Sequence, residues 1–119
     1  MDLNKLIKSF GYAIEGIFAA LKQQNMRIHF ISTLIVIVAG FLTGLSTIEW
    51  LIIVMMIALV IGAEMINSAI ESVVDLASPE IHSLAKKAKD IAAGAVLIFA
   101  ICSVVIGLII FVPKWFYNY

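Results

Sequence analysis

The chain has 119 residues, of which 63% are hydrophobic and only 13% are charged, and its mean hydropathy is +1.11. An ordinary soluble domain is about 45–50% apolar and about 25% charged, so this composition excludes a water-soluble monomer. Disordered chains and coiled coils are excluded as well, because both need far more charge. Since one transmembrane helix takes about 20 apolar residues, the length fits a single domain, residues 1–119, with three spans.

Charge and cysteine content narrow the possible functions further. Eight basic and eight acidic residues cancel, so no global field attracts nucleic acid, and we expect no nucleic-acid partner. The single cysteine, Cys102, lies in an apolar run and cannot form an intrachain disulfide. We interpret it as a small residue that faces lipid or a neighbouring helix rather than as a redox group.

Residues 3–24 have the pattern of an amphipathic helix. Apolar side chains recur every three or four positions, while polar and charged side chains fall mostly on the other side. This pattern predicts a helix in the membrane interface, and a packing helix that faces water is the weaker alternative beside so much apolar sequence. The apolar positions are Leu3, Leu6, Ile7, Phe10, Ile14, Ile17, Phe18 and Leu21.

Two apolar runs follow, and they predict the first two membrane spans. The first covers about residues 28–45 and carries few polar side chains, among them His29. A short turn at residues 44–47 separates it from the second, which covers about residues 49–75. This second span begins beside Trp50, an aromatic residue of the kind that is common at membrane interfaces. No charge interrupts residues 50–61, but the helical pattern then continues through several acids.

The third span is predicted at about residues 79–111, which makes the expected fold an all-α integral membrane protein with a surface helix and three transmembrane helices. Ser78, Pro79 and Glu80 have the pattern of an N-cap, a proline at the first helical position and a first-turn acid. Pro113 is expected to end this helix. An aromatic interfacial belt follows, made of Trp115, Phe116, Tyr117 and Tyr119.

The distribution of basic residues predicts the orientation in the membrane. Seven of the eight Lys and Arg residues precede the first span or flank the start of the third, and only Lys114 lies at the other end. By the positive-inside rule, the N-terminus and residues 76–90 face the cytoplasm. The turn at residues 46–49 and the C-terminus then face outward.

One face of the second span concentrates polar side chains. Relative to Glu64, helical geometry rotates Asn67 by about −60° and Glu71 by about −20°. Asp75 and Ser68 fall at about +20° and +40°, so three carboxylates, an amide and a hydroxyl share one stripe. A carboxylate as deep in the hydrocarbon core as Glu64 raises the free energy of membrane insertion by about 2.5 kcal/mol or more. Packing alone gives no reason for a carboxylate at this position. A protonated Glu64 in an interhelical hydrogen bond is the structural alternative.

The first turns of the third helix carry a complementary set of groups. His82, Lys86 and Lys89 lie on one face at i, i+4 and i+7, and Lys87 and Asp90 are close by in the sequence. Acids that face bases at the cytoplasmic boundary suit a divalent metal with a polyphosphate, the carboxylates holding Mg²⁺ and a lysine holding the phosphates. Anchoring to anionic lipid is the alternative for the lysines alone.

Motifs of other enzyme classes are missing from the sequence. It contains no glycine-rich phosphate loop, zinc-protease helix or nucleophile elbow, so helix side chains must hold any nucleotide. His29 could be a ligand, but interfacial hydrogen bonding is the favoured interpretation. The glycines are interpreted as close-packing positions between helices, and they are Gly11, Gly16, Gly40, Gly44, Gly62, Gly94 and Gly107.

Residues 64–75, EMINSAIESVVD, follow the pattern E-x-x-N-[ST]-A-I-E-x-x-[VI]-D. In this segment the chain resembles the family of small prokaryotic diacylglycerol and undecaprenol kinases, for which the pattern is highly specific. KSFGYA at residues 8–13, NMRIH at residues 25–29 and KDIAAGAVL at residues 89–97 extend the resemblance to about residues 5–113.

The resemblance implies a homotrimer in the bacterial cytoplasmic membrane, with active sites between subunits, that transfers the γ-phosphate of MgATP to a lipid hydroxyl. It implies that Glu64 is the general base, that Asn67 supports it and that Glu71 holds Mg²⁺. Ser68 and Asp75 belong to the same signature. The nucleotide contacts that it implies are Lys5, Tyr12, Glu80, His82, Lys89 and Asp90.

Two positions depart from the family pattern. The family usually carries a glutamate, as a second metal carboxylate, where this chain has Gln23. An amide oxygen can coordinate Mg²⁺ but brings no charge, so we expect Gln23 to be a weaker metal ligand. The residue before Gly16 is often lysine in the family and is Glu15 here.

Three questions stay open at the level of the sequence. The first is whether the acceptor is diacylglycerol or undecaprenol. The sequence does not distinguish them, because the apolar helix faces that would hold the lipid tail look alike for both. A cation or proton-coupled transporter would use Glu64 and Glu71 as a relay, although residues 50–61 offer no polar group for the outward half of such a path. A catalytically impaired family member that acts as a scaffold is the third possibility, because Gln23 replaces an acid.

Overall fold

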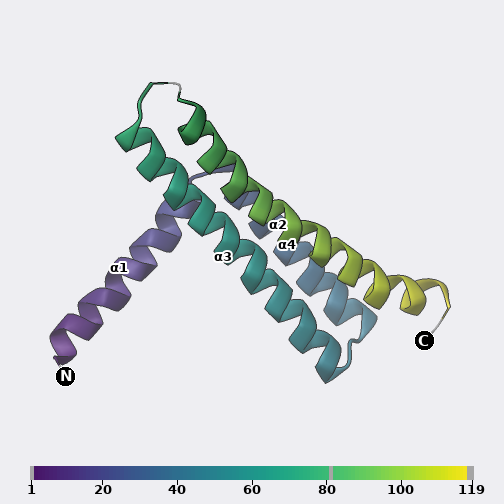
Figure 1. Cartoon of the computed structure of the whole chain (residues 1–119). Coiled ribbons are helices and arrows are strands. Elements are labelled where there is room, and N and C mark those ends of the chain that lie inside the picture. Colours follow the sequence, from purple (N-terminus) through teal and green to yellow (C-terminus); the bar gives the residue numbers. More distant parts are fainter. Residues whose placement is uncertain (1, 81, 118–119) are drawn as a thin grey trace.

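The computed structural model describes residues 2–80 and 82–117. Over these residues the chain forms four α-helices and no strand: α1 (Leu3–Leu21), α2 (Gln24–Thr43), α3 (Thr47–Ala77) and α4 (Ser83–Phe116). In Figure 1, α3 and α4 run side by side, α2 lies against them, and α1 projects away from the other three. The predicted all-α architecture is confirmed, and α2, α3 and α4 are each long and apolar enough to cross a membrane.

The surface of the three long helices is apolar to an extent that only a lipid environment explains. Large hydrophobic side chains are exposed along their whole length, from Ile28 on α2 to Ile109 on α4. At about 1.5 Å per residue, the 31 residues of α3 and the 34 residues of α4 also exceed a hydrocarbon core of about 30 Å. Both helices therefore extend beyond the core into the interfacial region.

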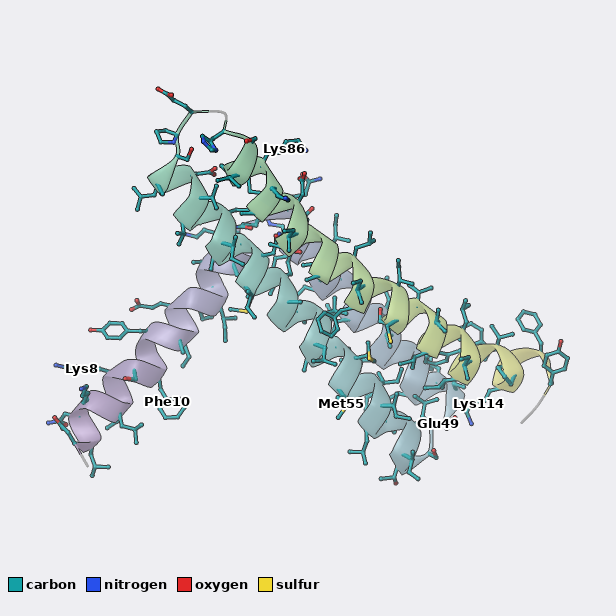
Figure 2. All side chains as sticks on the ribbon, in the orientation of Figure 1. Lys8, Phe10, Glu49, Met55, Lys86 and Lys114 are labelled. Atoms are coloured by element: carbon teal, nitrogen blue, oxygen red, sulfur yellow. The ribbon has the colours of Figure 1, made fainter. Side chains whose placement is uncertain are left out.

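Helix α1 has an unpartnered apolar face. Asp2 caps its N-terminus by accepting a hydrogen bond from the backbone N–H of Asn4 at 3.0 Å. Its apolar side chains remain exposed, and Ala20 is its one buried residue. Figure 2 shows Lys8 and Phe10 on opposite sides of α1, near the end of the helix that lies far from the bundle of α2, α3 and α4. This arrangement fits the interfacial helix that the sequence predicts.

An apolar cluster and an ion pair join α3 to α4 at the end of the bundle where α2 connects to α3. The side chains of Ile53, Ile110 and Phe111 form a buried cluster between α3 and α4. Glu49 pairs with Lys114 at 3.1 Å, so the beginning of α3 is tied to the last turns of α4. In Figure 2 these two residues lie at one end of the bundle and Lys86 lies at the opposite end, as the predicted orientation requires.

The beginning of α4 differs from the prediction. The helix begins at Ser83, four residues after Pro79, and His82 is its N-cap. Ser78 does not cap it, because this residue closes α3: its backbone N–H donates to the carbonyl of Val74 at 2.8 Å. The hydroxyl of Ser78 donates to the carbonyl of Glu80 at 3.2 Å and is likewise unavailable as an N-cap.

The end of α4 differs too, because Pro113 lies inside the helix, which continues to Phe116. Contacts beyond the proline hold the last turn in place. The indole N–H of Trp115 donates to the Thr43 hydroxyl at 2.8 Å, and the ring of Trp115 packs on Phe111 at 5.2 Å. The aromatic belt is exposed at Trp115, Phe116 and Tyr117, while Tyr119 lies outside the described residues.

The glycines only partly fit the interpretation as close-packing positions. A Cβ atom on Gly40 would lie 2.6 Å from the indole of Trp50, so this glycine lets α3 approach α2. Gly44 has a φ of +81° and ends α2 in the left-handed conformation that glycine favours. The interpretation is wrong for the other glycines within this single chain, since a Cβ atom would meet nothing within 4 Å at Gly11, Gly16, Gly62, Gly94 and Gly107.

Candidate active site

The acidic stripe of α3 is buried at its Glu64 end and exposed at its Asp75 end. Glu64, Asn67 and Ser68 are only 3%, 4% and 6% exposed, because this face of α3 turns towards α2 and α4. Glu71 is half-buried, and Asp75 is exposed. The stripe thus leads from the apolar interior of the bundle to its solvent-accessible end.

Asn67 and Glu71 are joined by a hydrogen bond one turn apart. The amide Nδ2 of Asn67 donates to Oε1 of Glu71 at 3.1 Å. The other polar atom of the same amide, Oδ1, is buried and has no hydrogen-bond partner. Because an unpaired buried acceptor costs about 1–3 kcal/mol, this atom marks a place where a donor group from outside the chain can bind.

Glu64 is contacted from α2. The imidazole Nε2 of His29 lies 3.6 Å from Oε2 of Glu64, and both side chains are largely buried. The sequence analysis did not select His29 as a site residue. The available signal was one imidazole near the beginning of an otherwise apolar span, but no spacing on α2 relates it to Glu64 on α3.

Gln23 reaches the same stripe from the junction between α1 and α2. Its Oε1 accepts a hydrogen bond of 2.6 Å from the hydroxyl of Ser68, although the two residues are 45 positions apart. Ser68 lies between Glu64 and Glu71 on α3, so this hydrogen bond ties Gln23 to the middle of the stripe.

The lysines of α4 take two different partners. Lys89 forms an ion pair with Asp75 across the α3–α4 interface, which joins the exposed end of the stripe to α4. Lys86 pairs with Asp90 on its own helix at 2.6 Å, and both of these side chains are largely exposed. Of the two lysines, Lys89 is therefore the one that the fold brings to the acids of α3.

Glu80 and His82 lie apart from the stripe, in and beside the connection between α3 and α4. The carbonyl of Glu80 accepts the Ser78 hydroxyl, and its side chain is exposed. His82 is exposed as well, and its Nδ1 accepts the backbone N–H of Leu84 at 3.1 Å. His82 therefore caps α4 in this structure.

Lys5 and Tyr12 lie farther away, on α1. Both are exposed, and α1 projects away from the α3–α4 pair on which the stripe lies (Figure 1). A single chain therefore does not bring these two residues to the stripe. It brings together Glu64, Asn67, Ser68, Glu71, Gln23, Asp75 and Lys89.

The donor atoms at the stripe suit a hard divalent cation. Glu71 supplies a carboxylate, and Gln23 and Asn67 supply amide oxygens. Among the described residues, no group of three His, Cys, Asp or Glu side chains forms a complete protein cage for a metal. Mg²⁺ that arrives with a nucleotide needs no such cage, because one or two carboxylates, the substrate phosphates and water complete its coordination. The residues present fit that mode of binding.

An apolar cavity of about 500 Å³ extends between α2, α3 and α4. His29 and Ser32 line it at the level of the stripe, and Trp115 lines it at the opposite end of the bundle. Aliphatic and aromatic side chains supply most of the remaining wall. The shape and lining suit the hydrocarbon chain of a lipid whose polar end lies near His29.

Comparisons with known proteins show which family the sequence of this chain matches. The family model described as prokaryotic diacylglycerol kinase matches residues 11–111. The chain is 46% identical to the undecaprenol kinase of Bacillus subtilis (strain 168) over 114 residues, which cover 95% of this chain and 93% of that protein. It is 33% identical to the diacylglycerol kinase of Escherichia coli (strain K12) over 102 residues, which cover 85% and 84% of the two chains. The diacylglycerol kinase of Synechocystis sp. is 43% identical over 110 residues, which cover 91% of this chain and 63% of that protein.

Proposed function

The chain belongs to the prokaryotic diacylglycerol kinase family, and we propose that it transfers the γ-phosphate of MgATP to the hydroxyl group of a membrane lipid. The single observation that carries this proposal is that one face of α3 carries a row of acidic and amide side chains, buried at Glu64 and exposed at Asp75. Glu64 is buried beside His29, which lines the apolar cavity, and Glu71, farther along the same face, is half-buried towards the exposed Asp75. A lipid alcohol and a nucleotide can approach such a face from opposite directions.

The acids and the amide of the stripe each have a role in this proposal. Glu64 accepts the proton of the lipid hydroxyl while the hydroxyl oxygen attacks the γ-phosphorus. The bond between that phosphorus and the ADP oxygen breaks at the same step. Asn67 supports the base through its amide. Glu71 and Gln23 would hold Mg²⁺, which would neutralise phosphate charge when bound. Lys89 leaves Asp75 to bind the phosphates, and Asp90, Glu80 and His82 line the nucleotide.

The acceptor is a lipid alcohol whose hydrocarbon chain occupies the cavity between α2, α3 and α4. Two observations support this placement: the cavity is mostly apolar, and its wall at His29 adjoins Glu64. Undecaprenol is the first acceptor to test, because identity to the undecaprenol kinase extends over nearly the whole of both chains. Diacylglycerol is the second, since the other two relatives described above carry that name.

We further propose a homotrimer in the bacterial cytoplasmic membrane with its N-terminus and active site in the cytoplasm and its C-terminus outside. The positions of Lys5 and Tyr12 favour an oligomer. Both are expected to contact the nucleotide, but within one chain they lie on α1, away from the stripe. The unpartnered Oδ1 of Asn67 also awaits a donor. A neighbouring subunit supplies α1 to the stripe in this arrangement.

The experiment uses purified protein in detergent with γ-labelled ATP and, in parallel, undecaprenol or diacylglycerol. We expect label in the lipid fraction of at least one reaction, and none when Mg²⁺ is removed with a chelator. Label in neither lipid contradicts the proposed function and favours a scaffold. Ion flux through reconstituted vesicles, without lipid labelling, would instead favour the transporter.

A further inference from the structure

The contact between His29 and Glu64 is the one feature of the buried site to which the proposed mechanism assigns no role. Nε2 of His29 lies 3.6 Å from Oε2 of Glu64, and the two side chains are 20% and 4% exposed. Within the described part of the chain, no other side chain pairs with this carboxylate. Since a buried polar group without a partner is disfavoured, the contact with the imidazole contributes to holding Glu64 inside the bundle.

His29 is also the residue that connects Glu64 to the cavity. It lines the cavity of about 500 Å³ together with Ser32 and Thr33, whereas Glu64 does not contribute to the wall. A lipid hydroxyl at this end of the cavity therefore meets the imidazole first and reaches the carboxylate beside it. The backbone of His29 is fixed as well, because its carbonyl accepts the hydroxyl of Thr33 at 2.8 Å.

We propose that His29 is a positioning residue for the base of the phosphoryl transfer. Its Nε2–H holds one carboxylate oxygen of Glu64, so that the other oxygen faces the lipid hydroxyl and receives its proton. The observed contact is slightly longer than a hydrogen bond, and catalytic pairs of this kind shorten when substrate binds. This inference rests on the proposed lipid kinase function and adds to it a residue from α2.

With His29 as a positioning residue, every bond and proton of the phosphoryl transfer is accounted for. The O–H bond of the lipid breaks and its proton moves to Glu64. The lipid oxygen forms a bond to the γ-phosphorus, and ADP departs with the electron pair of the bond that breaks. His29 donates the same N–H throughout and is neither consumed nor oxidised.

The test replaces His29 with leucine and with glutamine in the full-length protein. His29→Leu removes the donor, and we expect kcat to fall about 10- to 100-fold, the range for residues that orient a functional group, with little change in either KM. His29→Gln places an amide N–H at a similar reach, so we expect it to recover most of the lost kcat. Phe30→Leu is the matched control, because Phe30 is likewise half-buried on α2 but its side chain carries no polar group.

A stability measurement on the same variants tests the contact itself. We expect His29→Leu to lower the melting temperature clearly in wild type and much less in Glu64→Gln, because that background has no buried carboxylate to leave unpaired. Equal kcat losses for His29→Leu and His29→Gln, or a similar loss in Phe30→Leu, would overturn the positioning role. So would an unchanged kcat in His29→Leu. Absence of lipid phosphorylation in the wild-type protein would instead overturn the proposed function, so the two failures are distinguishable.

Discussion

The hydroxyl of Ser68 donates a hydrogen bond of 2.6 Å to Oε1 of Gln23, which joins the start of α2 to the centre of the acidic stripe on α3. The junction is closed by two further features: Met26 is fully buried, and the side chain Nε of Arg27 donates to the carbonyl of Leu21 at 3.2 Å. The side chain at position 23 therefore has a defined place at the middle of the stripe.

Removing the hydroxyl of Ser68 tests whether Gln23 is positioned for metal and nucleotide binding. A neutral hydrogen bond contributes about 1 kcal/mol, so Ser68→Ala is expected to raise the KM for MgATP about fivefold while kcat changes little. Steady-state kinetics at saturating lipid measure both constants. Ser72→Ala is the control, because the Ser72 hydroxyl donates to the carbonyl of Ser68 on its own helix. An unchanged KM in Ser68→Ala would show that Gln23 does not serve the nucleotide.

Replacing Gln23 with glutamate restores the carboxylate that the family usually carries. A second negative oxygen ligand beside Glu71 is expected to lower the Mg²⁺ concentration for half-maximal activity by about three- to tenfold. A magnesium titration at fixed ATP measures this concentration. The same titration of Gln23→Leu, which has no ligand oxygen, should show the opposite shift. If Gln23→Glu needs as much Mg²⁺ as the wild type, the side chain at position 23 is not a metal ligand.

Lys89 and Lys87 should differ sharply although both are lysines of the second turn of α4. Lys89 is paired with Asp75 on α3, whereas Lys87 is exposed and forms no ion pair with an acid in the described part of α3. Lys89→Met is expected to lower kcat/KM for ATP by about 100-fold, because it removes a charge from the transferring phosphate. Lys87→Met is expected to stay within about twofold of wild type. Similar losses in both variants would indicate that the lysines act through general attraction of ATP.

Gly40 is the glycine whose replacement is expected to damage the bundle. The Cβ atom of Gly40→Ala would collide with the indole of Trp50, and overpacking of this kind costs about 1–3 kcal/mol. Gly16→Ala, on the open surface of α1, is expected to be neutral or to stabilise by up to about 1 kcal/mol. Thermal unfolding in detergent compares the two. A stable Gly40→Ala protein would contradict the close approach of α2 and α3.

The helices of this fold could be predicted from the sequence because their signals are local. Three apolar runs and one amphipathic run are each long enough to specify a helix without knowledge of its neighbours. The ends of α4 were predicted incorrectly for the same reason. Ser78 and Pro113 carry strong local signals, but the end of α3 uses Ser78, and contacts of Trp115 with Thr43 and Phe111 carry the helix past the proline.

The part of the candidate site that lies on one helix could also be predicted. Helical periodicity alone aligns Glu64 with Asn67 and Glu71, and the structure shows these groups buried or half-buried on the inner side of α3. Contacts between helices could not be predicted in this way. The approach of His29 to Glu64 depends on the rotation and relative height of α2 against α3, which no spacing within either helix encodes.

The central claim is that Glu64 is the base of a lipid kinase, and transfer of label from γ-labelled ATP to lipid by Glu64→Gln tests it most directly. The substitution keeps the shape of the side chain and removes its ability to accept the proton. We predict that turnover falls at least about 100-fold, while ATP binding and oligomeric state, measured on the same preparation, match the wild type. Turnover by Glu64→Gln at the wild-type rate would contradict the account.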